Sequence, residues 1–249
     1  MTNIAICGAN GKMGKTIYNC VREREDCEVV AGIDIYTEQY ADFPIVETPD
    51  KLPVKPDVII DFSNPALLER LLDYCLSTGT PLVIGSTGYS EEQIGRIKAA
   101  ARQIPVFFTF NMSLGINLLV QLAKKAASVL GGQYDIEIVE KHHNQKIDAP
   151  SGTAIMLANA INETLDNSKH YVYDRHSRLQ KREKSEIGMH SIRGGTIVGE
   201  HDIIFAGHDE VITLSHSAAS KSVFAEGAIN AALFLKDQPA GLYDMSELV

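Results

Sequence analysis

The sequence predicts an α/β protein with two domains. The first is a Rossmann-like, doubly wound parallel sheet, because short apolar runs alternate with helical patterns over residues 1–110 and end in glycine-rich or polar turns. The second is an α+β domain with a mixed or antiparallel sheet, because strand patterns from residue 135 onwards follow one another with few helices between them. A chain of 249 residues is long enough for both.

Composition narrows the class of protein. Hydrophobic residues make up 45% and charged residues 22% of the chain, as in an ordinary globular protein. The net charge of −9 argues against nucleic acid or an anionic membrane as the main partner. The four cysteines form no CxxC pair, so neither a disulfide framework nor a thiolate metal site is indicated. With no apolar run of membrane-spanning length and no signal-peptide pattern, we expect a soluble cytoplasmic protein.

The first strand, Ile4–Cys7, leads into the glycine turn GANGKMG at 8–14, which opens a helix with Met13, Ile17 and Val21 on one face. Such a turn lets the backbone approach a pyrophosphate at a helix N-terminus, as in dinucleotide-binding folds. Its spacing is GxxGxxG and not the standard GxGxxG. The position of the turn, directly after the first strand, supports the assignment.

Asp34 follows the second strand, Glu28–Ile33, and lies twenty residues beyond Gly14. At this place an acidic residue can accept hydrogen bonds from the hydroxyls of the adenosine ribose, and an aspartate that merely caps a turn is the less favoured alternative. Asp34 would repel a 2′-phosphate, and Lys12 is the nearby cation that could offset this repulsion. If the dinucleotide is NADH or NADPH, these two charges predict that both are accepted, with NADH slightly favoured.

Three more apolar runs, at 58–62, 82–84 and 106–109, are typical of parallel strands that are buried on both faces. Helical patterns at about 63–76 and 90–102 separate them. The turns that follow the last two strands, Gly85–Gly88 and Thr109–Ser113, lie at the carboxyl ends of their strands, where the nicotinamide and its ribose are expected.

An amphipathic helix at 114–130 leaves the first domain, and a helix at 223–235 returns to it. We predict a dinucleotide-binding domain of residues 1–112 completed by 220–249. Residues 113–219 would form the substrate-binding and oligomerisation domain, with strands at 189–193, 199–206 and 211–217.

The stretch from Glu140 to Thr153, EKHHNQKIDAPSGT, concentrates groups that transfer protons and bind anions. Histidine is the side chain whose ordinary pKa lies nearest neutrality, so His142 and His143 are candidates to exchange a proton with a bound acid, and Lys146 adds a positive charge nearby. Ser151 or Thr153 begins a helix, whose N-terminus is a ready anion site. These residues predict a small carboxylated substrate that gains or loses a proton, although His-His pairs also occur on surface loops and Pro-Ser-Gly-Thr is also an ordinary helix start.

The run from Asp166 to Glu186 is polar and rich in arginine and lysine. Such a run is usually a solvated loop, and the acidic whole disfavours nucleic-acid binding. A flap beside an anionic substrate is the stronger functional alternative.

With these residues assembled, the chain resembles the dihydrodipicolinate reductase family, also called 4-hydroxy-tetrahydrodipicolinate reductase, over nearly its full length. The most specific block is EKHHNQKIDAPSGTA at 140–154. The other matching segments are GANGKMG at 8–14, GSTG at 85–88, FNMSLGIN at 110–117, RGGTIVGEH at 193–201 and HSAASKSVFAEGA at 216–228.

The resemblance implies a homotetrameric reductase, assembled through the second sheet, that transfers hydride from NADH or NADPH to a cyclic unsaturated dicarboxylate on the diaminopimelate route to lysine. It implies that His142 and Lys146 handle the proton. The residues implied to bind the substrate carboxylate are His143, Ser151, Gly152 and Thr153. The residues implied to bind the dinucleotide are Gly8, Ala9, Asn10, Gly11, Lys12, Met13, Asp34, Gly85, Ser86, Thr87, Thr109, Phe110, Asn111 and Met112.

The chain departs from the family pattern at three places. Lys12 and Lys221 stand where arginine is usual, and Ile35 follows Asp34 where many members have a basic residue. The last departure weakens the case for a 2′-phosphate contact at the end of the second strand.

Other functions fit the sequence less well. A redox-sensing regulator without turnover would not need the proton-transfer residues, and a serine hydrolase would need a GxSxG elbow that the chain lacks. A metal site is not indicated, because the candidate histidines lack the spacing of a zinc site. These candidates are His142, His190, His201 and His208. Another amino-acid dehydrogenase is the nearest alternative of the same class.

Overall fold

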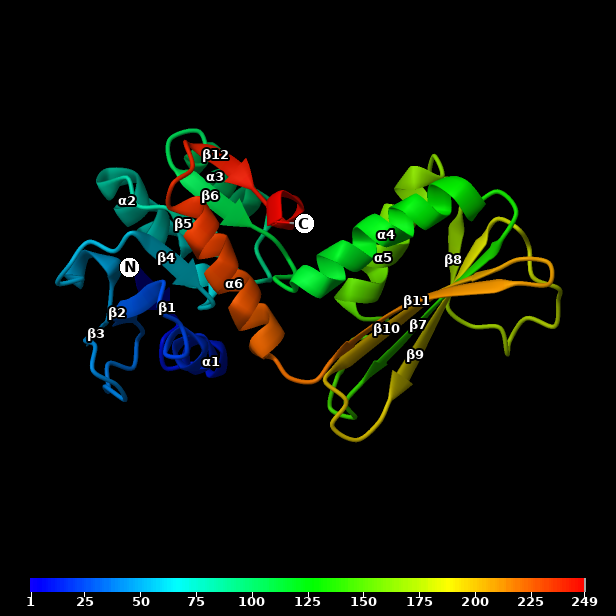
Figure 1. Cartoon of the computed structure of the whole chain (residues 1–249), viewed down its shortest axis with the longest axis horizontal. Coiled ribbons are helices and arrows are strands. Elements are labelled where there is room, and N and C mark those ends of the chain that lie inside the picture. Colours follow the sequence, from blue (N-terminus) through cyan, green and yellow to red (C-terminus); the bar gives the residue numbers. More distant parts are fainter. Residues whose placement is uncertain (249) are drawn as a thin grey trace. The chain divides into compact units, whose positions relative to one another are not determined.

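The computed structural model describes residues 1–248 and divides into two compact units (Figure 1). The first unit holds Met1–Leu114 together with the chain from Lys221 onwards, and the second holds Gly115–Ser220. These bounds lie within two residues of the boundaries expected from the sequence. No helix among the described residues is long and apolar enough to cross a membrane.

Within the described residues, the first unit contains a seven-stranded sheet in which every neighbouring pair is parallel. The strands, in spatial order, are β12 (Gly241–Tyr243), β6 (Pro105–Phe108), β5 (Leu82–Ile84), β4 (Val58–Asp61), β1 (Thr2–Cys7), β2 (Cys27–Ile33) and β3 (Ile45–Val46). The predicted parallel sheet is confirmed. The sequence did not indicate β3 and β12, which are only two and three residues long.

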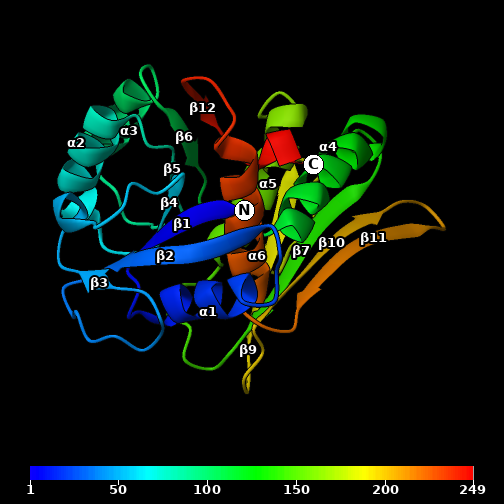
Figure 2. The same ribbon diagram turned by 60° about the vertical axis from the view of Figure 1, so that its left-hand side comes forward.

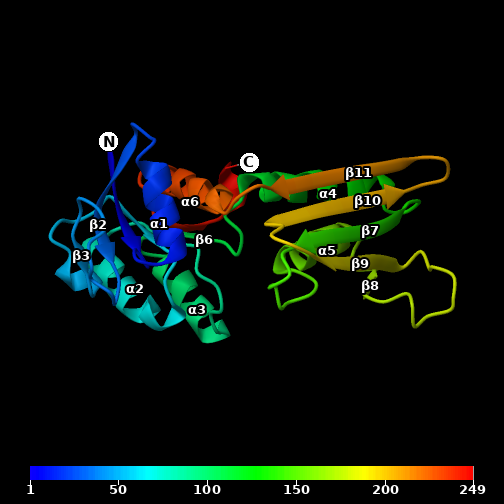
Figure 3. The ribbon, with the colours of Figure 1, turned by 90° about the horizontal axis from the view of Figure 1, so that it is seen from below.

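Helices cover both faces of this sheet, as a doubly wound fold requires (Figure 3). Alternate residues of β1 point to opposite faces, so Ile4 packs with one layer of helices and Ala5 with the other. The first layer is α1 (Lys12–Val21) and α6 (Ser222–Leu235), and the second is α2 (Leu68–Thr78) and α3 (Glu91–Ala100). The short 3₁₀ helices are η1 (Pro49–Lys51), η2 (Pro65–Leu67) and η3 (Met245–Leu248).

The second unit is a five-stranded mixed sheet with helices on one face (Figures 1 and 2). Its strands, in spatial order, are β11 (Val211–Ala218), β10 (Gly199–Ala206), β7 (Asp135–His142), β9 (Glu186–Arg193) and β8 (His170–Val172). The helices α4 (Leu114–Leu130) and α5 (Gly152–Thr164) pack their apolar side chains on the sheet, for example Ile116 and Leu157 against Ile138. The predicted second domain with a mixed sheet is confirmed.

The polar run 166–186 contains strand β8, which the sequence did not indicate. Its arginines form ion pairs with the sheet: Arg175 and Arg182 both bind Glu137, at 2.7 and 2.9 Å, and Arg175 also binds Glu186 at 2.7 Å. Much of the positive charge of this run is therefore neutralised locally.

Helix α6 packs closely against the backbone of Met112 at Gly227. A Cβ atom at Gly227 would lie 1.7 Å from the backbone oxygen of Met112, whereas one at Gly95 in α3 would meet nothing within 4 Å. We expect Gly227→Ala to lower the free energy of unfolding by about 2 kcal/mol or more. Gly95→Ala should raise it by roughly 0.5–1 kcal/mol through helix propensity. Urea denaturation measures both, and a Gly227→Ala midpoint equal to that of the wild type would contradict this packing.

Candidate functional site

The glycine turn after β1 has a backbone conformation that residues with a side chain rarely adopt. Gly8 has a φ of +82°, and a Cβ atom there would lie 2.7 Å from the backbone oxygen of Phe62. A Cβ atom at Gly14 would lie 2.3 Å from the oxygen of Gly8. Gly11 is the N-cap of α1, and no side chain caps this helix. The N–H groups of its first turn are therefore available to an anion such as a pyrophosphate.

A cavity of about 740 Å³ opens beside this turn and is lined by Gly8, Asn10, Gly11 and Asp34. The carboxylate of Asp34 accepts hydrogen bonds from the backbone N–H of Asn10 at 2.9 Å and of Tyr36 at 3.0 Å. These bonds tie the glycine turn to the end of β2 and hold Asp34 at the cavity wall. In a Rossmann-like fold the adenosine ribose and pyrophosphate bind at this place, between the glycine turn and the end of the second strand, and we call this cavity the adenosine cavity.

A second cavity, of about 260 Å³, brings together further residues predicted to bind the dinucleotide. Its predicted lining residues are Lys12, Met13, Gly85, Phe110, Asn111 and Met112, and it is also lined by Phe62, Lys221 and Phe224. The hydroxyl of Thr109 bonds the backbone of Asn111 at 3.3 Å and so supports this wall. Ala9 is fully buried and Thr87 is exposed, and neither lines either cavity.

Asp61, at the end of β4, organises the two turns that flank these cavities, and it was not among the residues predicted from the sequence. Its buried carboxylate accepts hydrogen bonds from Ser63, through N–H at 3.0 Å and Oγ at 2.5 Å, from Ser86 Oγ at 3.0 Å and from the Tyr89 hydroxyl at 3.1 Å. Burial and the nearby Asp61 charge raise the pKa of Tyr89, so its hydroxyl remains a donor. Ser86 therefore supports the site through Asp61. An acidic residue at the end of a buried apolar strand was the available signal.

In the second unit, the alternation of β7 places Glu140 and His142 on the same buried face. Strand pairing sets His142 opposite Arg193 of β9 and Glu140 opposite His201 of β10. Glu140 Oε2 lies 2.5 Å from His142 Nδ1, and Arg193 binds both carboxylate oxygens, at 2.7 and 2.8 Å. The N–H of Ser151 donates to Glu140 Oε1 at 3.2 Å. One carboxylate thus joins β7, β9 and the start of α5.

The charge state of Glu140 determines what His142 can do. Burial would raise the pKa of Glu140, but hydrogen bonds from Arg193, Ser191 and His142 outweigh it and lower the pKa to about 2. An ionised carboxylate only accepts hydrogen bonds, so the Nδ1 of His142 carries a hydrogen and Nε2 is the atom left for proton exchange. A Cβ atom at Gly199 would lie 3.2 Å from Nε2, so the glycine leaves space there.

His201, which the sequence suggested only as a candidate metal ligand, is a further member of this cluster. Its Nε2 lies 3.0 Å from Ser151 Oγ, which also accepts the N–H of Ala154 as the cap of α5. The rings of His201 and His142 meet edge to face at 5.3 Å. Burial, followed by the charge of His142, lowers the pKa of His201 to about 4, so His201 is neutral at physiological pH.

Lys146 lies in the loop between β7 and α5 and forms an ion pair with Asp148 at 2.9 Å. The hydrogen bond from Lys146 lowers the pKa of Asp148. The backbone oxygen of Asp148 accepts from Arg193 Nη2 at 2.7 Å, which connects the loop to the Glu140 cluster. His143 directly follows β7, and Gly152 and Thr153 are the first two residues of α5.

The four histidines considered as metal ligands do not gather. His190 pairs with Glu137 at 2.7 Å, and the exposed His208 pairs with Asp209, whereas His142 and His201 share the Glu140 cluster. Among the described residues, the group spaced to hold a metal ion is His170, Glu183 and Glu186. The carboxylate of Glu186 is already bound by Arg175, which disfavours a cation there.

A parallel doubly wound sheet with an uncapped glycine turn and adjoining cavities defines a Rossmann-like dinucleotide-binding fold. Structures of several dehydrogenases share this fold, among them GenD2 from gentamicin A biosynthesis in complex with NAD, at 11% identity and a TM-score of 0.61, covering 96% of this chain and 87% of that one. The family models for the N-terminus and the C-terminus of dihydrodipicolinate reductase match residues 2–112 and 115–249. The chain belongs to the dihydrodipicolinate reductase family.

Individual relatives match this chain over nearly its whole length. The 4-hydroxy-tetrahydrodipicolinate reductase of Caldanaerobacter subterraneus subsp. tengcongensis is 50% identical, covering 100% of this chain and 98% of that protein. The enzyme of the same name from Clostridium tetani is 46% identical, covering 98% and 96%. The structure of dipicolinate-bound dihydrodipicolinate reductase from Paenisporosarcina sp. TG-14 is 26% identical, with a TM-score of 0.84 and complete coverage of both chains.

The glycine turn makes a direct prediction about cofactor affinity. Gly11 has ordinary backbone angles, so Gly11→Val should fold, but its side chain would enter the space beside the helix N-terminus. We expect NADH affinity to fall by roughly tenfold or more, measured by fluorescence titration. Gly95→Val, in open space on α3, is the matched control. Unchanged NADH affinity in folded Gly11→Val would remove the turn from the cofactor site.

Glu140 makes a prediction about stability and pH. Because the pKa of Glu140 is about 2 in the folded protein and near 4.5 in its ordinary state, its stabilisation is complete above pH 4.5 and is lost as the pH falls toward 2. We expect Glu140→Gln to lower the free energy of unfolding at neutral pH by about 3 kcal/mol and to flatten its pH dependence over that window. Glu69→Gln, which breaks a surface ion pair with Arg96, should change it by less than about 0.5 kcal/mol. Identical unfolding profiles for Glu140→Gln and wild type, from denaturant titrations across that pH window, would show that the pair is not stabilising.

Proposed function

We propose that this protein reduces 4-hydroxy-tetrahydrodipicolinate to tetrahydrodipicolinate with a nicotinamide dinucleotide, on the diaminopimelate route to lysine, and that His142 and Lys146 handle the proton. Family membership supports the reaction. The observation that supports the residue roles is the Glu140–His142 pair, at 2.5 Å, because it orients one imidazole nitrogen and leaves the other for the substrate.

The adenosine cavity and the smaller cavity beside it would hold the dinucleotide, which supplies the hydride when bound. The chain contributes the glycine turn, the N–H groups of α1 and the carboxylate of Asp34. Asp34 suits free ribose hydroxyls and opposes a 2′-phosphate. We infer that both NADH and NADPH are used, with NADH slightly favoured.

The substrate carboxylates would bind at the start of α5, a helix of thirteen residues whose N-terminus attracts anions. The backbone N–H of Ser151 is already donated to Glu140, and its Oγ accepts from Ala154. We propose that Gly152 and Thr153, the first two residues of α5, bind the substrate carboxylates together with His143 and Lys146. Ser151 would contribute by fixing this turn through its contacts with Glu140, Ala154 and His201.

The proton chemistry follows from the same contacts. Glu140 accepts from Nδ1 of His142 and fixes the ring so that Nε2 is left for the substrate, while Arg193 binds the same carboxylate. Lys146 is a cation that can either donate a proton or neutralise a substrate carboxylate. Its ion pair with Asp148 would keep it directed into the loop until a substrate arrives.

The uncovered face of the second sheet supports the proposed homotetramer. Helices α4 and α5 lie on one face, while exposed apolar side chains such as Ile192 and Val211 remain on the strands. Exposed apolar groups on a sheet are typical of a surface that a second copy covers. Sedimentation velocity at several protein concentrations tests this assembly.

A direct assay tests the proposed reaction. Nicotinamide absorbance is followed while the substrate is generated from pyruvate and aspartate semialdehyde, with NADH and NADPH in separate runs. Oxidation of a nicotinamide cofactor only when both precursors and their condensing enzyme are present would support the proposal. No oxidation with either cofactor would overturn it.

His142 and Lys146 should affect turnover more than cofactor binding. General acid–base groups typically contribute about 10²–10⁴-fold, so we expect His142→Gln and Lys146→Ala each to lower kcat by a factor in that range with nearly unchanged NADH affinity. If Lys146 only binds a carboxylate, its loss should instead raise KM. His208→Gln, an exposed histidine outside the cluster, is the control. Near-normal kcat and KM in both variants would make the segment a structural helix start.

A further inference from the structure

The cations near the predicted dinucleotide site do not lie where the sequence predicted them. Lys12 was expected to offset the charge of Asp34, but it lines the smaller cavity with Phe110 and Asn111. The cation that lines the adenosine cavity together with Asp34 is Arg70, from helix α2. Arg70 lies 36 residues further along the chain than Asp34, and no sequence motif connected the two.

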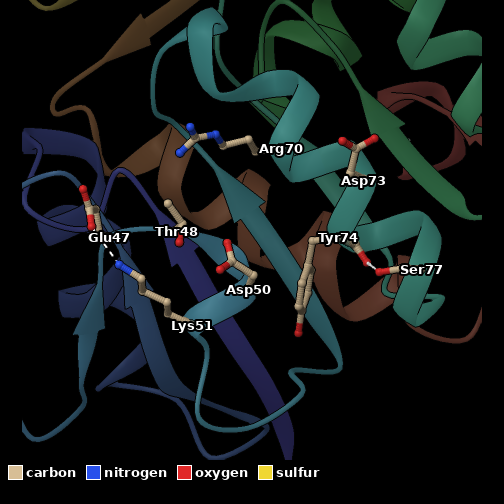
Figure 4. A pocket seen from close by; sticks show the side chains of 8 residues that line it. All are labelled: Glu47, Thr48, Asp50, Lys51, Arg70, Asp73, Tyr74 and Ser77. Atoms are coloured by element: carbon tan, nitrogen blue, oxygen red, sulfur yellow. Dashed lines mark hydrogen bonds and ion pairs between the residues drawn. The ribbon is translucent and has the colours of Figure 1, made fainter.

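Arg70 has no partner of its own among the described residues. It is exposed and makes no ion pair or side-chain hydrogen bond there, although it also borders a neighbouring polar cavity of about 710 Å³ (Figure 4). In that cavity Lys51 is paired with Glu47 at 2.9 Å, while the guanidinium of Arg70 is joined to nothing. Asp50 and Asp73 line the same cavity and partly offset the positive charge at longer range.

We propose that Arg70 binds the 2′-phosphate of NADPH and is the residue that lets this reductase use NADPH beside NADH. The inference rests on the proposed function, because it assigns the adenosine cavity to the dinucleotide. A guanidinium matches phosphate with two parallel N–H donors, and an unpaired one loses no existing partner on binding. Its charge also offsets the repulsion between Asp34 and the 2′-phosphate.

The end of β2 does not supply an alternative cation. Ile35 and Tyr36 follow Asp34 there, and both side chains are largely exposed at the cavity wall. They can cover the apolar face of an adenine ring but cannot neutralise a phosphate. The charge must therefore come from another element, and α2 is the element that brings a guanidinium to this cavity.

The contact would be exposed, so its contribution should be moderate and sensitive to salt. We expect Arg70→Ala to lower kcat/KM for NADPH by about tenfold and to change the value for NADH by less than about twofold. Arg70→Lys should retain part of the NADPH activity, because it keeps the charge and loses the two-pronged geometry. Raising the ionic strength from about 0.05 M to about 0.5 M should lower kcat/KM for NADPH more than kcat/KM for NADH, and Arg70→Ala should remove this difference.

Two further variants separate the possible cations. Lys51 borders only the neighbouring cavity, so Lys51→Ala should leave the ratio of NADPH to NADH activity as in the wild type. Lys12→Ala tests the cation expected from the sequence. Selective loss of NADPH activity in Arg70→Ala alone supports the proposal. Selective loss in Lys12→Ala alone, or an equal loss of NADH and NADPH activity in Arg70→Ala, overturns it, as does a wild type that does not use NADPH. Absence of turnover with either cofactor would instead show that the proposed function fails.

Discussion

The Glu140 carboxylate is the group on which the arrangement of the second unit depends. It lies fully buried at the end of β7 and is bound by Arg193 from β9, by the ring of His142 and by the N–H of Ser151 at the start of α5. A buried carboxylate without such partners would cost several kcal/mol, so the surrounding segments must stay in place for it to remain charged. The orientation of the imidazole is therefore a consequence of folding and does not require the substrate.

The first unit uses the same physical device with a different purpose. Asp61, at the end of β4, is almost fully buried and draws in Ser63, Ser86 and Tyr89 from two neighbouring turns. Both turns adjoin the cavities assigned to the dinucleotide. Here the donors are neutral hydroxyl and N–H groups, so the carboxylate fixes loop shape without assembling a proton-transfer group. In each unit, a carboxylate near the carboxyl end of a strand fixes the conformation of the loops beside it.

Most of the fold could be predicted because it depends on local patterns. The apolar runs of β4 and β5 and the amphipathic α4 are visible in the sequence, whereas β3 and β12 are too short and depend on pairing with neighbours. His142 could be predicted from its crowded segment. Its partner Arg193 and neighbouring His201 could not, because only strand register sets them beside His142 and Glu140. Arg70 escaped prediction for the same reason, since helix α2 brings it to Asp34 from a distant part of the chain.

The charge balance of the Glu140 cluster bears on how substrate and proton are linked. Glu140 is neutralised by Arg193 and Asp148 by Lys146, so these four groups carry no net charge before a ligand arrives. A dicarboxylate must then draw Lys146 away from Asp148, rely on the N–H groups of α5, or attract an additional proton. Under the proposed function, His142, with Nδ1 bound to Glu140 and Nε2 left open, would carry that proton. Binding of the dianion and supply of the proton for its reduction would thus be coupled through one electrostatic requirement, which agrees with the proposal that the residues for both tasks lie in one short segment.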